Sequence, residues 1–67
     1  MDVKKRLATN MKRLRKERGW SQEALADASG LDRTYISAIE RNVKNPTVIV
    51  IERVALALEC RMSNLLD

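Results

Sequence analysis

The chain has 67 residues, of which 45% are apolar and 33% charged, so one small domain over residues 1–67 is expected. A domain of this size buries only about 60% of the surface that its unfolded chain exposes, so a partner is expected to add to its stability. With no His and one Cys, an internal disulfide is excluded, and no metal site, cofactor or Cys/His catalytic centre is expected. No apolar run approaches the ~20 residues of a membrane span, and no signal region is recognisable, so a soluble cytoplasmic protein is expected.

Basic residues are concentrated at the start of the chain. Eight of the thirteen Lys and Arg residues lie within the first eighteen positions, where only two residues are acidic. Such a segment suits an anionic polymer or a membrane surface, and it also suits a solvated helix face. Its charge alone does not decide between these interpretations.

The same segment has the apolar spacing of a helix. Leu7, Met11 and Leu14 recur at helical intervals, which predicts an amphipathic helix from Val3 to about Arg18. Gly19 is expected to end this helix, because it adopts the left-handed conformation common just beyond a helix end. Trp20 then packs beneath the turn.

Two short helices are predicted next. Ser21 can accept a hydrogen bond from a first-turn amide and so cap a helix from Gln22 to about Ser29, which Gly30 ends. Asp32 is the next N-cap, for a helix that continues to about Arg41. Only a few residues separate the two helices.

The last third of the chain predicts a loop and two further helices. The polar segment Asn42–Pro46 is expected to be non-helical because of its proline, and Thr47 restarts the helical pattern. A helix from Val48 to about Leu58 follows, and a short one from Met62 to Leu66 returns its two leucines to the core. The predicted core stripe of the longer helix is Val48, Ile51, Val54, Ala55 and Leu58. No run alternates with strand period, so the fold class is all-α.

The two central helices have the pattern of a helix-turn-helix, in which the first helix braces the second across a DNA groove. Ala26 is placed where the helices come closest, Gly30 where the chain turns, and Ile36 and Ile39 where the second helix faces inward. Small or apolar residues thus stand wherever two steeply crossing helices must touch.

At these residues the sequence resembles the phage repressor and Cro-like helix-turn-helix family, also called the xenobiotic-response-element family. The matching residues are Ser21-Gln22-Glu23-x-Leu25-Ala26, Gly30-Leu31, Arg33-x-Tyr35-Ile36-Ser37-x-Ile39-Glu40-Arg41 and Asn45-Pro46-Thr47. The resemblance implies a compact five-helix, lambda-repressor-like domain that binds double-stranded DNA as a homodimer and regulates transcription in bacteria or phages. Within the family, the segments around Tyr35 and Glu40 look most like the controller proteins of restriction-modification systems.

Three residues depart from the family pattern. Asn42 stands where the family usually has Gly, but Asn tolerates a left-handed backbone well. Glu59 replaces the Gly that usually ends the fourth helix, and Arg61 replaces the Ser or Thr that usually caps the fifth. The last helix is therefore expected to be placed or capped differently.

The resemblance assigns four positions to DNA bases. They lie at the start of the second helix of the motif and are Arg33, Thr34, Ser37 and Ala38. Arg33 can pair with O6 and N7 of guanine, or alternatively bind a phosphate. Thr34 offers a methyl and a hydroxyl group, Ser37 a hydroxyl, and Ala38 only apolar contact.

Further positions are assigned to the DNA backbone. Gln22, at the start of the bracing helix, matches a backbone contact of the family, and the alternative is a solvent-exposed glutamine. The other expected backbone contacts flank the groove and are Tyr35, Arg41, Lys44 and Asn45. For Tyr35, packing is the competing role.

Several other side chains have structural or open roles. Arg15 and Glu40 resemble a family pair that orients the recognition helix, although independent surface charges are the alternative. The Lys4-Lys5-Arg6 cluster suits either the phosphate backbone or a frayed terminus. Cys60 is expected to be a small buried apolar side chain rather than a redox sensor.

The fourth helix has a second apolar stripe. Ile49 and Leu56 lie seven residues apart and nearly opposite the core stripe, with Val50 and Ala57 on their flanks. Such a patch is complementary to its own copy about a twofold axis, so we expect a homodimer interface there. The alternative is that the terminal segment folds over part of it.

Two function classes follow. The first is a dimeric, sequence-specific DNA-binding regulator of transcription, often a repressor, with RNA polymerase as a further possible partner. The second is an antitoxin-like interaction module that binds another protein through the second apolar stripe. No enzyme is expected, because no nucleophile has an identifiable base.

Overall fold

The computed structural model describes residues 2–67, and this part of the chain contains five helices and no strand. The helices are α1 (Val3–Glu17), α2 (Gln22–Ser29), α3 (Arg33–Glu40), α4 (Val48–Ala57) and α5 (Met62–Leu66). The all-α class is confirmed, and each helix boundary agrees with its prediction within one residue. No helix among the described residues is long and apolar enough to cross a bilayer.

Four of the helices begin with a side-chain cap, and in α1 the Asp2 carboxylate accepts a hydrogen bond from the amide of Lys4 at 3.0 Å. The Ser21 hydroxyl accepts a hydrogen bond from the amide of Ala24 at 3.0 Å, and the Asp32 carboxylate accepts one from Thr34 at 2.7 Å. Thr47 caps α4 through the amide of Val50 at 3.2 Å. Each cap stabilises its helix by about 1 kcal/mol, because it satisfies an amide that has no partner within the helix.

Two of the unusual positions adopt the left-handed backbone that the family pattern requires. Asn42 has φ 61° and Glu59 has φ 54°. A residue with a Cβ atom adopts this conformation at a cost in free energy, and the cost is smallest for Asn. Glu59 adopts this conformation, and its carboxylate binds the Arg18 guanidinium at 2.6 Å. This ion pair connects the end of α4 to the end of α1.

The start of α5 is capped in an unusual way, as its sequence predicts. Arg61 occupies the N-cap position, but a guanidinium group carries only donors and cannot accept a bond from a helix amide. Instead, the amide of Arg61 donates to Oδ1 of Asn64 at 2.9 Å. At the other end of α5, Arg6 and Asn10 of α1 donate to the carbonyls of Leu66 and Leu65, each at 2.9 Å.

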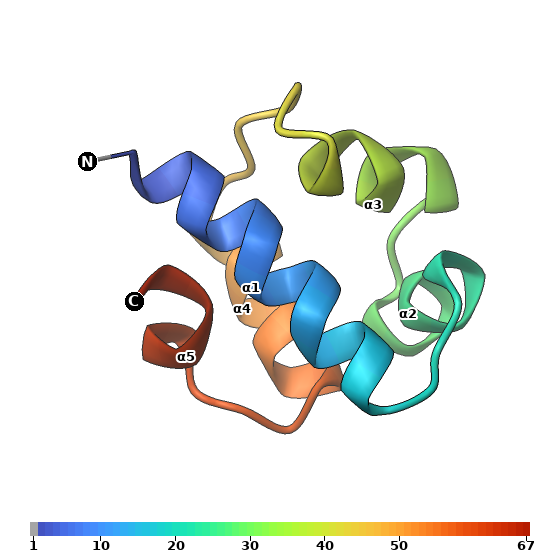
Figure 1. The fold of residues 1–67 in the computed structure, drawn as a ribbon. Helices are drawn as coiled ribbons and strands as arrows, with labels where there is room; N and C mark the ends of the chain where they lie inside the picture. The colour runs from blue at the N-terminus through green and yellow to red at the C-terminus, as the bar shows by residue number, and fades with distance from the viewer. Residues whose placement is uncertain (1) are drawn as a thin grey trace.

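All five helices contribute to one hydrophobic core. In Figure 1, α1 runs across the molecule with α4 behind it, α5 on one side and the α2–α3 pair on the other. Met11, Leu25, Ile36 and Leu65 are fully buried at the centre of this arrangement. Trp20 is half-buried and packs against this core. Because α2 and α3 lie against the core along one side each, their remaining faces are available for a ligand.

One predicted core residue is wrong. Val48 is 70% exposed rather than buried, although Val54 and Leu58 of the same stripe are in the core. Pro46 and Val50 instead line a small cavity together with Leu7 and Met11, and Val48 does not take part in it. Val48 is the first residue of α4 and lies in its exposed first turn.

Candidate nucleic-acid interface

The turn between α2 and α3 is fixed by backbone geometry. Gly30 has φ 70°, and the amide of Leu31 donates to the carbonyl of Ala26 at 3.0 Å, which closes the end of α2. Leu25 and Ile36 are buried where the two helices meet the core. The helix-turn-helix prediction is therefore confirmed, and α3 is held rigidly along its inner face.

The outer face of α3 presents the four predicted base-contacting residues. Arg33 and Thr34 are exposed in the first turn, and Ser37 and Ala38 lie half-buried one turn later. These positions recur at helical spacing and so occupy one side of the helix. This side combines a guanidinium fork, two hydroxyl groups and two methyl groups, which are chemical groups that read base edges in a major groove.

A shallow hollow of about 430 Å³ lies along the same face. Its walls are formed by Thr34, Tyr35 and Ala38 of α3 together with Asp32 and Lys44. The Lys44 ammonium lies 6.0 Å from the centre of the Tyr35 ring, within the range of a cation–π interaction. Tyr35 also packs against the core, so it fills the packing role considered for it while one side of its ring borders the hollow.

A charged network behind α3 connects three helices. Arg15 of α1 binds both carboxylate oxygens of Glu40, at 2.8 Å and 2.9 Å, and the carbonyl of Trp20 at 2.7 Å. The side chains of Arg15 and Glu40 are only 9% and 2% exposed. The Glu40 hydrogen bonds raise the pKa of Arg15, an effect that burial partly opposes and the nearby negative charge reinforces. The predicted orienting pair is thus present.

The sequence did not indicate how Gln22 joins this network. Its amide nitrogen donates to Oε1 of Glu40 at 3.1 Å, which fixes the side chain at the start of α2. A primary amide has two N–H groups, so one donor is left for another acceptor. Glu40 therefore links the start of α2, the last turn of α1 and the end of α3.

The remaining predicted backbone contacts lie after α3. Arg41, Lys44 and Asn45 are exposed in the loop that follows the helix. The loop leaves α3 through the left-handed Asn42, and the amide of Val43 donates to the carbonyl of Ala38 at 3.0 Å. This turn keeps the three polar side chains close to the end of α3.

The outer side of α4 exposes three large apolar side chains beside two charged ones. Ile49 is 68% exposed and Leu56 71% exposed, and together with the exposed Val48 they form what we call the apolar face of α4. The flanking residues Val50 and Ala57 are half-buried and pack against the core. In the described part of the chain, no terminal segment folds over Ile49 and Leu56.

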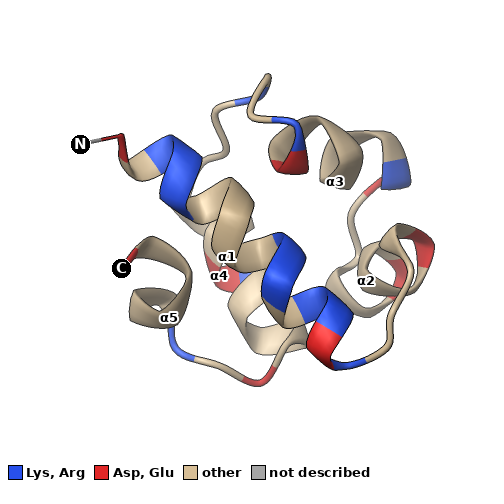
Figure 2. Cartoon of the chain, viewed as in Figure 1, with Lys and Arg blue, Asp and Glu red and all other residues tan. Residues whose placement is uncertain are grey.

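Charge is distributed unevenly over the molecule. Figure 2 shows that Lys and Arg occupy much of α1, the start of α3 and the loop after α3, whereas the end of α3 and α2 carry acidic residues. Of the Lys4-Lys5-Arg6 cluster, Arg6 is used in binding the carbonyl of Leu66. Basic side chains of α1 and the first residue after α3 line a common groove beside the end of α3.

Comparison with known proteins gives the same picture. A sequence model of the helix-turn-helix family (HTH_3) matches residues 11–65. A hypothetical transcription factor of Neisseria meningitidis is 51% identical over 57 residues, which are 85% of this chain and 54% of the relative. The control protein C.SmaI of Serratia marcescens is 42% identical over 66 residues, or 98% of this chain and 79% of that protein.

Solved structures agree with these relatives. The crystal structure of the Neisseria transcription factor NHTF superimposes with a TM-score of 0.95 at 47% identity, covering 98% of this chain and 76% of that one. The restriction-modification controller protein C.Esp1396I was solved as a tetramer in complex with its natural 35 base-pair operator. It superimposes with a TM-score of 0.86 at 35% identity, and the match covers 100% of this chain and 99% of that one. The chain spans about half the length of the curated Neisseria relative.

Proposed function

Because the chain belongs to the helix-turn-helix family, we propose that it is a sequence-specific regulator of transcription that binds palindromic operator DNA as a homodimer. The observation that carries this proposal is the rigidly held α3 with its outward Arg33, Thr34, Ser37 and Ala38. A major groove admits one α-helix, and residues at the start of that helix meet the base edges.

Base reading rests chiefly on Arg33. Its guanidinium fork can bond O6 and N7 of guanine, a contact worth about 1 to 3 kcal/mol of discrimination. Thr34 and Ser37 can add hydroxyl contacts, and Ala38 can meet a thymine methyl group. Asp32, which caps α3 from its side chain, fixes the start of the helix where these groups are presented.

Positioning on the duplex rests on groups that flank α3. Gln22 presents its second N–H beside the start of α2, where helix amides also favour a phosphate. Arg41, Lys44 and Asn45 are exposed at the other end, beside Tyr35. Contacts of this kind fix the register of a protein on DNA and carry no base preference.

Dimerisation rests on the apolar face of α4. Its exposed isoleucine and leucine would stay in water in a monomer, and a twofold axis would bury them against their own copies, with Val50 and Ala57 at the edge. Two recognition helices about 34 Å apart would then enter successive major grooves on one side of the duplex. The tetrameric controller protein on its operator supports self-association in this family.

The proposal extends to the setting in which the protein acts. A regulator of this kind acts at promoters in the bacterial cytoplasm, where RNA polymerase is a further partner. The similarity to the C.SmaI and C.Esp1396I controller proteins favours a role beside a restriction-modification system.

The test is selection of bound duplexes from a random pool. The expected result is an enriched consensus with twofold symmetry, whose half-sites lie one helical turn apart. A pool that shows no enrichment, or a consensus without symmetry, would contradict the proposal.

A further inference from the structure

An open groove of about 460 Å³ lies between α1 and the end of α3, beside the surfaces assigned above. Three lysines of α1, Lys5, Lys12 and Lys16, line it on one side, and Arg41 and Asn42 line it on the other. The groove therefore has strongly basic walls. The lysines of α1 have no role in the contacts described so far.

The positive charge of this groove is not neutralised within the described residues. Its three lysines and Arg41 form none of the ion pairs found in residues 2–67. Glu40 also lines the groove, but both its oxygens are bound by Arg15. Lys12 and Lys16 are one helical turn apart, so their ammonium groups repel each other unless an anion lies between them.

The groove lies between two positions expected to contact the DNA backbone. Glu40, in its wall, accepts a hydrogen bond from Gln22 at 3.1 Å, and Arg41 is the next residue along the chain. A DNA strand that passes from the start of α2 to the end of α3 would cross the mouth of the groove. A strand of phosphodiesters supplies the anion that the lysines lack.

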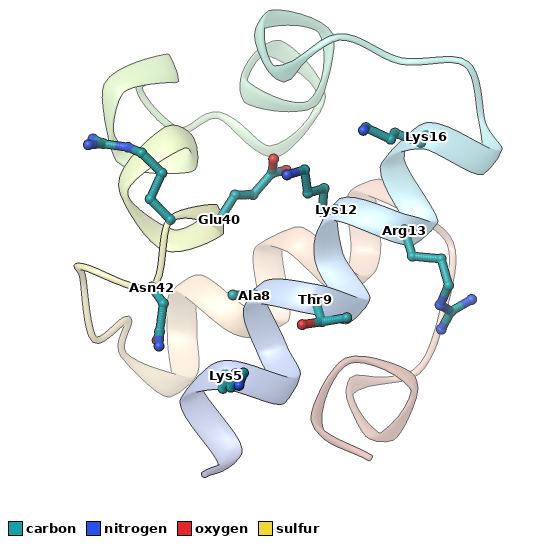
Figure 3. Close-up of a pocket in the computed structure, with 9 residues that line it drawn as sticks. Lys5, Ala8, Thr9, Lys12, Arg13, Lys16, Glu40 and Asn42 are labelled. Atoms are coloured by element: carbon teal, nitrogen blue, oxygen red, sulfur yellow. The ribbon is translucent and has the colours of Figure 1, made fainter.

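The side chains that line the groove differ in direction. In Figure 3, Lys12 and Lys16 extend from α1 toward the side of Glu40, whereas Arg13 extends away from it. Arg13 is also paired with Glu17 at 3.1 Å. Lys12 and Lys16 are therefore the candidates for an anion, and Arg13 is a matched residue on the same helix.

From this geometry we propose that the groove between α1 and α3 holds backbone phosphates of the bound duplex, with Lys12 and Lys16 as their ligands. The inference rests on the proposed DNA-binding function and extends its contact surface from the helix-turn-helix to α1. The two lysines act as positioning residues: they add affinity for any sequence and strengthen its salt dependence, without reading bases.

The test is the double substitution Lys12→Gln with Lys16→Gln, compared with Arg13→Gln, on the selected operator and on an unrelated duplex. Each phosphate contact contributes about 0.9 to the slope of log K against log salt, so the double variant should flatten that slope by about two for each bound protomer, and by about four for the homodimer. Affinity for both duplexes should fall by a similar factor, and the selected consensus should stay the same. Arg13→Gln should change the slope by much less than one.

A charge-retaining variant separates a phosphate contact from a folding defect. Lys12→Arg with Lys16→Arg should keep the wild-type slope, and all variants should keep the helical circular dichroism of the wild type. An unchanged slope in the double Gln variant, or an altered consensus, would overturn the inference while leaving the DNA-binding proposal intact. If the wild-type protein selects no duplex, the proposed function itself fails.

Free phosphate is the other source of this anion. Titration of the DNA-free protein with inorganic phosphate, at constant ionic strength, should give no saturable binding. Saturable binding of phosphate that is lost in the double Gln variant would assign the groove to a free anion and overturn the proposal.

Discussion

Glu40 couples three helices through one carboxylate. It accepts two hydrogen bonds from Arg15 and one from Gln22, and it is almost completely buried. Two buried charges stabilise a fold only while each one neutralises the other. The orientation of α3 therefore depends on a residue that need not touch DNA.

The first prediction concerns this carboxylate. Glu40→Gln leaves the Arg15 guanidinium without a counter-charge, and we expect a loss of about 3 kcal/mol in the free energy of unfolding, measured by urea denaturation. Adding Arg15→Met should recover much of that loss, because no buried charge then remains. A single variant as stable as the wild type would show that the pair contributes little.

The second prediction concerns base reading by Arg33. Arg33→Ala should relax the preference at one position of each half-site by about 1 to 3 kcal/mol, measured by competition between operator and singly substituted duplexes. Arg41→Ala is the comparison, because a phosphate contact should weaken binding to all sequences alike. Equal losses on every duplex from Arg33→Ala would make Arg33 a backbone contact.

The third prediction concerns Cys60, which is half-buried against the core. Burial raises the pKa of its thiol, and the Arg18 guanidinium partly opposes this. A raised pKa in the folded state favours the neutral thiol, so Cys60 stabilises the fold below its unfolded pKa of about 8.5 and loses this contribution as the pH rises through the folded value.

Urea denaturation of wild type and Cys60→Ala at neutral and alkaline pH tests this sign. The stability advantage of the wild type should shrink as the pH is raised, since the other titrating groups are common to both proteins. An advantage that grows with pH would mean that the thiolate, not the thiol, is favoured in the folded state.

At the scale of single elements, α4 has to serve two surfaces. Val54, Ala55 and Leu58 face the core, while Val48, Ile49 and Leu56 face outward. Two charged residues of α4 are exposed as well, so only part of its outer side is apolar. Exposed apolar patches mark interfaces, and in the proposed dimer a second copy of the chain covers this one.

The fourth prediction follows from that face. Ile49→Asp with Leu56→Asp should convert the dimer to a monomer, because two carboxylates would meet their own copies across the twofold axis, and sedimentation equilibrium measures the change. Val3→Asp, which alters an exposed apolar residue of α1, is the control and should leave the dimer intact. Persistence of the dimer in the double variant would place the interface elsewhere.

At the scale of the whole molecule, the sequence predicts the helices better than it predicts their polar contacts. Periodicity and capping residues such as Ser21 and Asp32 are local signals, so the five helices and the turn at Gly30 followed from them. The pairing of Arg15 with Glu40 followed only from a family resemblance, because it joins residues 25 positions apart.

Other features depend on tertiary packing and could not be read from spacing. Val48 has the period of a core residue but is 70% exposed in the first turn of α4. The bond between Gln22 and Glu40 and the groove beside Lys12 arise where α1, α2 and α3 converge. Such arrangements are set by how the helices cross, which no local pattern encodes.

DNA binding as proposed requires that the outer side of α3 enters the major groove of the duplex. Titration of the isotope-labelled protein with its selected operator, followed by amide NMR signals, tests this directly. The largest shifts should occur in residues 33–38 and at the start of α2, with small shifts in α5. Saturable binding that leaves the signals of residues 33–38 unmoved would contradict this mode of binding.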